Sequence, residues 1–197
     1  METSKLKKFA QYARRTLMEQ VSSKLKLVLE PDSAARREND KAVADLEKQI
    51  RAFSEEQVVE KIAYVWFNRF CALRYMDVNR FNPVGVLSPI PGQFQPEILA
   101  EAKMGVMDAT MIPDKIQKKV AGLLNGSISS GNAQNEAYRL LIGAVCNYYN
   151  KTMPFLFQKI ADYTELLMPD NLLSGNSILS YTREALYPEV CDSGTLF

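Results

Sequence analysis

The chain has 197 residues, of which 47% are hydrophobic and 24% are charged, with 24 Lys and Arg against 23 Asp and Glu. This length predicts one sizeable core, and the formal charge of +1 gives the whole molecule no bias toward nucleic acid or membrane. Because the sequence has no histidine, imidazole bases, Ser-His-Asp and Cys-His nucleophile systems, and His-ligated metal sites are excluded.

A long amphipathic helix is predicted from Ser4 to about Leu29, because apolar residues recur there every three or four positions. At about 100° per residue, a group of cations projects from the opposite side of this helix. The group consists of Lys5, Lys8, Arg15 and Lys26, and Lys7 and Arg14 flank the apolar stripe. Two interpretations stay open, a solvated face and a DNA-binding contact to phosphates, which needs only Lys and Arg along a surface.

Glu30-Pro31-Asp32 ends this helix, and a second helix is predicted from Ser33 to Phe53. The two helices predict an antiparallel hairpin. Residues 1–53 are therefore expected to form a basic helical hairpin, next to a bundle at residues 54–192 and a tail at 193–197, within a single domain that covers 1–197.

A buried central helix is predicted over residues 55–79, because the run from Val58 to Met76 is apolar or aromatic on nearly every side of a helical wheel. Ser54 and Gln57 fit a capping box at its start. Polar residues interrupt the run, and some of them are expected to be paired inside; they are Glu60, Lys61, Asn68, Arg69, Arg74 and Asp77. The charges exclude a membrane span.

A long irregular loop is predicted over residues 80–95, where prolines cluster and Val86 and Leu87 are the one candidate for a short strand. Five further helices are predicted beyond it. Their expected ranges are Pro96 to Gly105, Pro113 to Gly126, Ala133 to Lys151 with Asn132 as its cap, Phe155 to Leu167, and Ser177 to Leu186. The sequence therefore predicts an all-α fold, an irregular bundle of about eight helices around the central helix. The helix from Ala133 to Lys151 is expected to be the main packing partner of the central helix.

The three cysteines, Cys71, Cys146 and Cys191, lie far apart and form no CxxC pair. This spacing argues against disulfides and a zinc site, favours a reducing cytoplasm, and makes Cys71 and Cys146 core residues. Gly85 and Gly92 stand isolated among prolines, so no phosphate-binding glycine loop is predicted.

Carboxylate and aromatic pairs are interpreted as structural. Glu55-Glu56 and Glu97 with Glu101 are expected at helix starts and solvated faces. Trp66-Phe67 and Tyr148-Tyr149 are expected in the core. The residues alone therefore predict a helical interaction module, with no catalytic, cofactor-binding or metal residues and no membrane contact.

Four segments, in order along the chain, carry a more specific resemblance. They are YVWFNRFCALRYMDVNRF at 64–81, QPEILAEA at 95–102, NEAYRLLIGAVCNYYNKTMPFLF at 135–157 and NLLSGNSILSYTREAL at 171–186. Together they resemble the N-terminal region of the PglX/BrxX family, the adenine-specific DNA methyltransferases of BREX phage-exclusion systems.

This resemblance implies that the parent is a much longer, S-adenosylmethionine-dependent enzyme, which methylates adenine N6 and takes part in phage defence and restriction-modification with other BREX proteins. The chain stops before the doubly wound methyltransferase core of that family. Asn82-Pro83-Val84-Gly85 starts like the family's catalytic motif but lacks its second proline and its aromatic residue, so no catalytic or methyl-donor residue is carried over.

Three hypotheses follow. In the first, the chain is a non-catalytic N-terminal domain that docks on the catalytic core, DNA or another BREX subunit. In the second, the basic first helix binds the phosphates of the DNA backbone. In the third, the chain is a stand-alone regulator or oligomerisation module.

Overall fold

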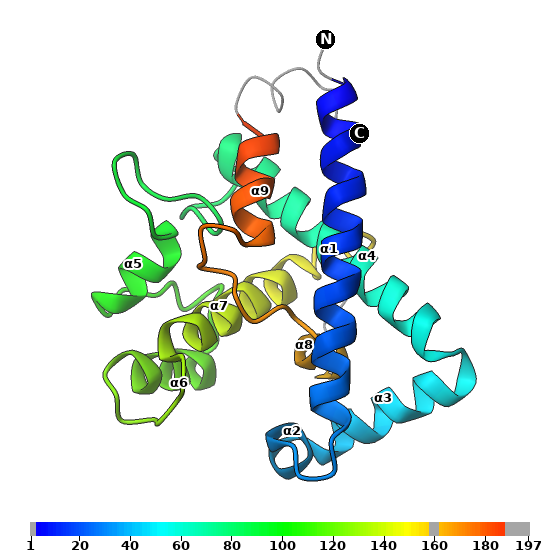
Figure 1. The fold of residues 1–197 in the computed structure, drawn as a ribbon. Coiled ribbons are helices and arrows are strands. Elements are labelled where there is room, and N and C mark those ends of the chain that lie inside the picture. Colours follow the sequence, from blue (N-terminus) through cyan, green and yellow to red (C-terminus); the bar gives the residue numbers. More distant parts are fainter. Residues whose placement is uncertain (1–2, 158–161, 188–197) are drawn as a thin grey trace. The chain divides into compact units, whose positions relative to one another are not determined.

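The computed structural model describes residues 3–157 and 162–187 (Figure 1). These residues form nine helices and no strand, which confirms the all-α prediction. The chain divides into two compact units. Unit 1 comprises Met1–Asn68 and Lys159–Pro169, and unit 2 comprises Arg69–Gln158 and Asp170–Phe197.

Unit 1 begins with α1, Thr3–Leu29, where the first amphipathic helix was predicted. Its apolar stripe is buried at Ala13, Leu17, Val21 and Leu25. Lys26 lies in the last turn, where a positive charge interacts favourably with the helix dipole.

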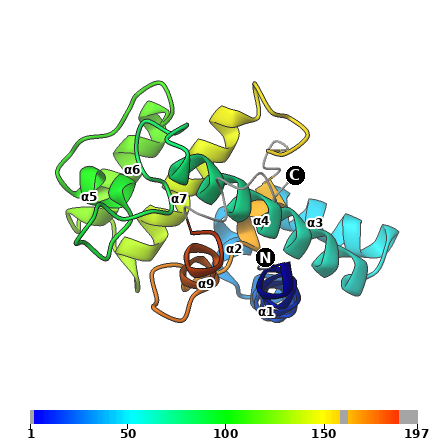
Figure 2. The ribbon, with the colours of Figure 1, turned by 90° about the horizontal axis from the view of Figure 1, so that it is seen from above.

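The predicted helix from Ser33 to Phe53 is in fact two helices, α2 (Ala34–Glu38) and α3 (Asp40–Ala52). Asn39 divides them because its backbone, at φ −139° and ψ 45°, lies outside the helical region. Figures 1 and 2 show α3 running across the direction of α1 rather than back along it. The two segments therefore form a helical corner, not the predicted antiparallel hairpin.

The central helix is α4, Glu55–Val78. At its start the Ser54 hydroxyl accepts a hydrogen bond from the Gln57 backbone N–H at 3.2 Å, as the capping signal predicted. From residue 65 to residue 79 no side chain is exposed, whereas the first half exposes Glu55, Glu56, Gln57, Glu60, Lys61 and Tyr64. Burial on every side, predicted for the whole helix, therefore holds only for its second half.

The first half of α4 belongs to unit 1, where Trp66 is fully buried. The Trp66 indole Nε1 donates a hydrogen bond to the backbone oxygen of Thr164 at 3.1 Å. Thr164 lies in the short helix α8, Asp162–Leu166. This bond links residues that are 98 positions apart in the sequence and closes the core of unit 1.

Unit 2 contains α5 (Glu97–Lys103), α6 (Asp114–Leu124), α7 (Ala133–Tyr149) and α9 (Ile178–Ala185). The predicted start residues occupy their N-cap positions; these are Pro96, Pro113, Asn132 and Ser177. Both views show α6 and α7 side by side (Figures 1 and 2). The closest backbone neighbour of α7 is therefore α6 rather than the central helix.

Two further predictions differ from the structure. The helix expected from Phe155 to Leu167 is present only as α8, since the chain forms turns up to Phe157 and residues 158–161 lie outside the described residues. Val86 and Leu87 form no strand, and the loop has only an isolated bridge between Pro89 and Pro96. Cys191 and the predicted tail at 193–197 also lie outside the described residues. In the parts that are described, no helix is long and apolar enough to cross a membrane.

Candidate functional site

The predicted basic face lies on the surface of α1, and Lys5, Lys8, Arg15 and Lys26 are all exposed. Helix geometry places Lys8 and Arg15 about 10 Å apart along the axis, and Lys26 about 16 Å further on. The exposed Glu19 falls on the same face by the helical period. This face is therefore a basic strip with one acidic interruption, which is suited to contact with phosphates.

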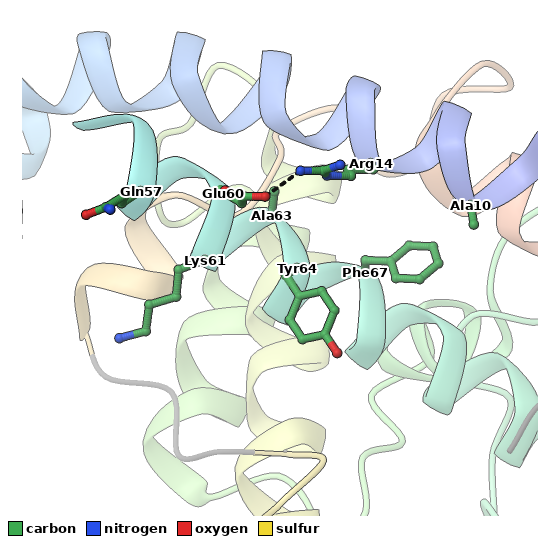
Figure 3. A pocket seen from close by; sticks show the side chains of 8 residues that line it. All are labelled: Ala10, Arg14, Gln57, Glu60, Lys61, Ala63, Tyr64 and Phe67. Atoms are coloured by element: carbon green, nitrogen blue, oxygen red, sulfur yellow. Dashed lines mark hydrogen bonds and ion pairs between the residues drawn. The ribbon is translucent and has the colours of Figure 1, made fainter. Parts of the chain in front are cut away.

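Arg14, predicted to flank the apolar stripe, forms an ion pair with Glu60 of α4. The pair crosses the rim of an open groove between α1 and the first half of α4, which we call the α1–α4 groove (Figure 3). Its volume is about 470 Å³. It is lined by Ala10, Arg14, Gln57, Glu60, Lys61, Ala63, Tyr64 and Phe67.

The α1–α4 groove is mainly apolar. Ala10 and Ala63 contribute small side chains, and Phe67 packs against Phe9 with ring centroids 5.9 Å apart. Tyr64 is 66% exposed, although it lies two residues from the fully buried Trp66. A second hollow of about 250 Å³ shares Gln57 and Lys61 with the groove. These shared residues form a ridge of α4 with an apolar depression on each side.

In unit 2, the carboxylate of Asp77 near the end of α4 holds the proline-rich loop. Oδ1 accepts from the Asn82 side-chain amide at 2.5 Å and from the Val86 N–H at 2.9 Å. Oδ2 accepts from the Leu87 N–H at 2.7 Å, and from the N–H and hydroxyl of Ser88 at 2.9 and 2.8 Å. We call this arrangement the Asp77 clamp. Burial raises the pKa of the Asp77 carboxyl, and the hydrogen bonds offset part of that effect.

Neighbouring side chains support the Asp77 clamp. Arg74 Nη1 donates to the Ser88 hydroxyl at 2.6 Å. The buried Tyr138 hydroxyl donates to the Val86 backbone oxygen at 2.9 Å. The Tyr149 hydroxyl donates to Asn82 Oδ1 at 2.7 Å. The Asn82 amide is thus engaged on both sides, which gives this residue a structural role in the loop.

Glu97 lies in the first turn of α5, as expected for a charge at a helix start, but it is not on a solvated face. Its Oε2 accepts a hydrogen bond from the Gly85 N–H at 2.6 Å, and Glu97 is only half-exposed. A side chain added at Gly85 would meet Glu97 Oε2 at 2.9 Å and the Ser88 backbone oxygen at 2.7 Å. Asp77 precedes the loop in the sequence and Glu97 follows it. The two carboxylates therefore hold the same loop by hydrogen bonds from its two ends.

The buried thiol of Cys146 is held in an unreactive state. Cys146 is fully buried, as predicted, and burial raises the pKa of its thiol to about 12, with nearby Arg69 lowering it slightly. Such a thiol is a poor nucleophile because the thiolate is the reactive form. Cys71 is half-buried. Within the described residues, no group of three His, Cys, Asp or Glu side chains is placed to hold a metal ion.

Sequence reasoning missed the α1–α4 groove because it treated all of α4 as buried. The signal was present: polar residues cluster in the first turns, at Glu55, Glu56, Gln57, Glu60 and Lys61. It named Asp77 among the polar residues of which some would be paired inside, but it missed the partners in the Asp77 clamp, whose backbone N–H groups lie 9 to 11 residues away in an irregular loop. No local sequence pattern marks a carboxylate that accepts from such a loop.

The geometry defines a class of protein: an all-helical chain whose described residues offer a basic strip and an apolar groove to the solvent. No family model matches the chain. It is similar to "Adenine-specific methyltransferase BrxX" of Escherichia coli O9:H4 (strain HS), with 30% identity over 213 aligned residues that cover 91% of this chain and 16% of the relative.

It is also similar to "Adenine-specific methyltransferase PglX" of Lacticaseibacillus casei (strain Zhang), with 26% identity, covering 89% of this chain and 17% of the relative. The chain is thus homologous to one region of the BrxX and PglX adenine-specific methyltransferases, and it spans 16–17% of their length. The matches are consistent with the predicted N-terminal region of such proteins.

Proposed function

We propose that residues 1–197 form a non-catalytic N-terminal region of a BREX-type adenine-N6 DNA methyltransferase involved in phage defence. The region acts as a scaffold or interaction module for the catalytic core, DNA or another BREX subunit. In the parent enzyme DNA is the substrate and S-adenosylmethionine the methyl donor. The observation that carries the proposal is that 91% of the chain aligns with only 16% of BrxX.

The fold supports a non-catalytic role. A methyltransferase core of this kind holds its methyl donor beside a strand of a doubly wound parallel sheet. The described residues are helical and contribute no strand to such a sheet. The one partial match to the catalytic motif, at Asn82-Pro83, is used in the Asp77 clamp. Methyl transfer is therefore assigned to the rest of the parent protein.

Co-expression in two pieces tests this function. A tagged chain of residues 1–197 is produced together with the remaining part of the parent methyltransferase, and the tagged chain is purified. We expect the two pieces to co-purify, because a scaffold must contact the protein that it supports. If the remaining part methylates DNA normally without residues 1–197 and never associates with them, the proposal is refuted.

A second candidate function is DNA-backbone binding by α1, favoured by the exposure of all four predicted cations. Affinity for duplex DNA should then fall steeply with salt, because each phosphate that a cation neutralises contributes about −0.9 to the slope of log affinity against log salt concentration. The triple variant Lys8→Glu, Arg15→Glu, Lys26→Glu should abolish binding.

The matched control reverses three exposed lysines elsewhere, Lys41→Glu, Lys48→Glu and Lys115→Glu. It changes the net charge equally, so it separates a specific strip from general attraction. Salt-independent binding, or equally weakened binding in both triple variants, would remove this candidate.

A further inference from the structure

We propose that the α1–α4 groove binds an amphipathic helix from the remaining part of the parent methyltransferase, with apolar side chains in the groove and a carboxylate facing Lys61. This inference rests on the proposed function. It goes beyond that function by naming the docking surface and the chemistry of the segment that occupies it.

The dimensions of the α1–α4 groove suit a helix. Its lining runs along α4 from Gln57 to Phe67, about 15 Å at the rise of a helix, which corresponds to about three turns of a bound segment. Ala10 and Ala63 have small side chains, so the backbone of a bound helix can approach the floor of the groove closely. Six of the eight lining residues are exposed, which makes the groove open along its length rather than a closed small-molecule pocket.

The charges around the α1–α4 groove indicate the chemistry of the segment that binds there. Arg14 is already neutralised by Glu60, so this part of the rim offers no net charge. Lys61 is exposed and makes no ion pair with any described residue. Figure 3 shows its side chain extending from α4 away from both Tyr64 and the Arg14–Glu60 pair. A segment that lies along this surface therefore meets one uncompensated positive charge, and a carboxylate complements it.

Tyr64 supplies the anchor. It is 66% exposed, and burial of a large aromatic side chain is a common source of interface energy. Phe53, at the second hollow, is 63% exposed and extends the apolar surface across the ridge. Since the relatives are about six times as long as this chain, a segment of the same polypeptide is available at high effective concentration.

The test measures the affinity of residues 1–197 for the remaining part of the parent methyltransferase, with the two supplied as separate polypeptides. Lys61→Glu and Tyr64→Ala change exposed side chains, and Ala10→Trp fills the groove from α1. Each variant should weaken binding about tenfold or more. The controls Lys41→Glu and Phe94→Ala also change exposed side chains, and they should leave affinity within about twofold.

A photo-crosslinking residue at position 64 identifies the occupant. Mass spectrometry should find it attached to a peptide with a helical apolar pattern and an Asp or Glu. Changing that acid to Lys should restore binding to Lys61→Glu, which a purely structural defect in the variant would not allow. Circular dichroism melting of each variant verifies that it remains folded.

The outcomes are distinct. If the wild-type chain binds and the three groove variants bind equally well, the inference is overturned and the proposed function stands. If the wild-type chain does not bind the remaining part, the inference is overturned, and so is the part of the proposed function that makes the catalytic core its partner. Crosslinks to a second copy of residues 1–197, or groove variants that weaken DNA binding while protein binding is unchanged, would identify a different occupant and overturn the inference.

Discussion

The two halves of α4 carry similar numbers of polar residues but use them in opposite ways. In the first half, Glu60 and Lys61 are exposed, and the α1–α4 groove is open beside them. In the second half, Arg74 and Asp77 are withdrawn from solvent and hydrogen-bonded. A polar residue in an apolar helix thus marks either a solvent-facing side or an internal anchor, and its partners decide which.

The largest expected effect comes from Trp66, compared with Tyr64 on the same helix. Trp66 is fully buried and hydrogen-bonded, so Trp66→Ala should lower the free energy of unfolding by about 3–5 kcal/mol. Tyr64→Ala should change it by about 0.5 kcal/mol or less, because the side chain is mainly exposed. Urea titration followed by circular dichroism measures both. Similar destabilisation of the two variants would contradict the burial difference.

The second prediction concerns Asp77. Asp77→Ala removes the acceptor for three backbone N–H groups and two side chains, so we expect the free energy of unfolding to fall by about 3 kcal/mol. Asp45→Ala, an exposed change in α3, is the control and should be nearly neutral. Backbone amide exchange should also accelerate at residues 86–88. Unchanged exchange there would mean that the Asp77 clamp does not hold the loop.

A smaller effect is expected for Tyr138, whose buried hydroxyl donates to the Val86 backbone oxygen. Tyr138→Phe removes one hydrogen-bond donor from that oxygen, so the free energy of unfolding should fall by about 1 kcal/mol. Tyr64→Phe is the matched control, since it removes an exposed hydroxyl. Equal stability of both variants in the urea titration would show that the Tyr138 bond contributes nothing.

The smallest expected effect is a pH dependence of stability from Asp77. Because its pKa is higher in the folded protein than in the unfolded chain, the folded state binds the proton more tightly. The free energy of unfolding should therefore decrease as pH rises from the ordinary Asp value through the raised value. This decrease should be missing from Asp77→Ala. An opposite slope would mean that the hydrogen bonds outweigh burial.

Local signals predicted where helices begin. Ser54, Asn132 and Ser177 each cap a helix through a side-chain oxygen, and that geometry depends on residues only three positions away. Asn39 was missed because it interrupts a pattern that remains periodic on both sides of it. Helix starts with a side-chain cap were thus predictable, whereas the break at Asn39 and the turns up to Phe157 were not.

The functional surfaces were predictable only where sequence alone determines exposure. The basic strip of α1 follows from helical periodicity, and the structure places its four cations at the surface. Whether they bind DNA stays a prediction. The α1–α4 groove and the Asp77 clamp depend on segments brought together by folding, such as Ala10 with Phe67, or Asp77 with Val86. A single sequence carries no direct record of such pairings.

The most direct test of the account measures transfer of labelled methyl groups from S-adenosylmethionine to adenine-containing DNA. Purified residues 1–197 are assayed alone and beside the longer methyltransferase of which we propose they are a part. We expect incorporation by the longer protein and none by residues 1–197. Incorporation by residues 1–197 alone, abolished when the donor is withheld, would contradict it.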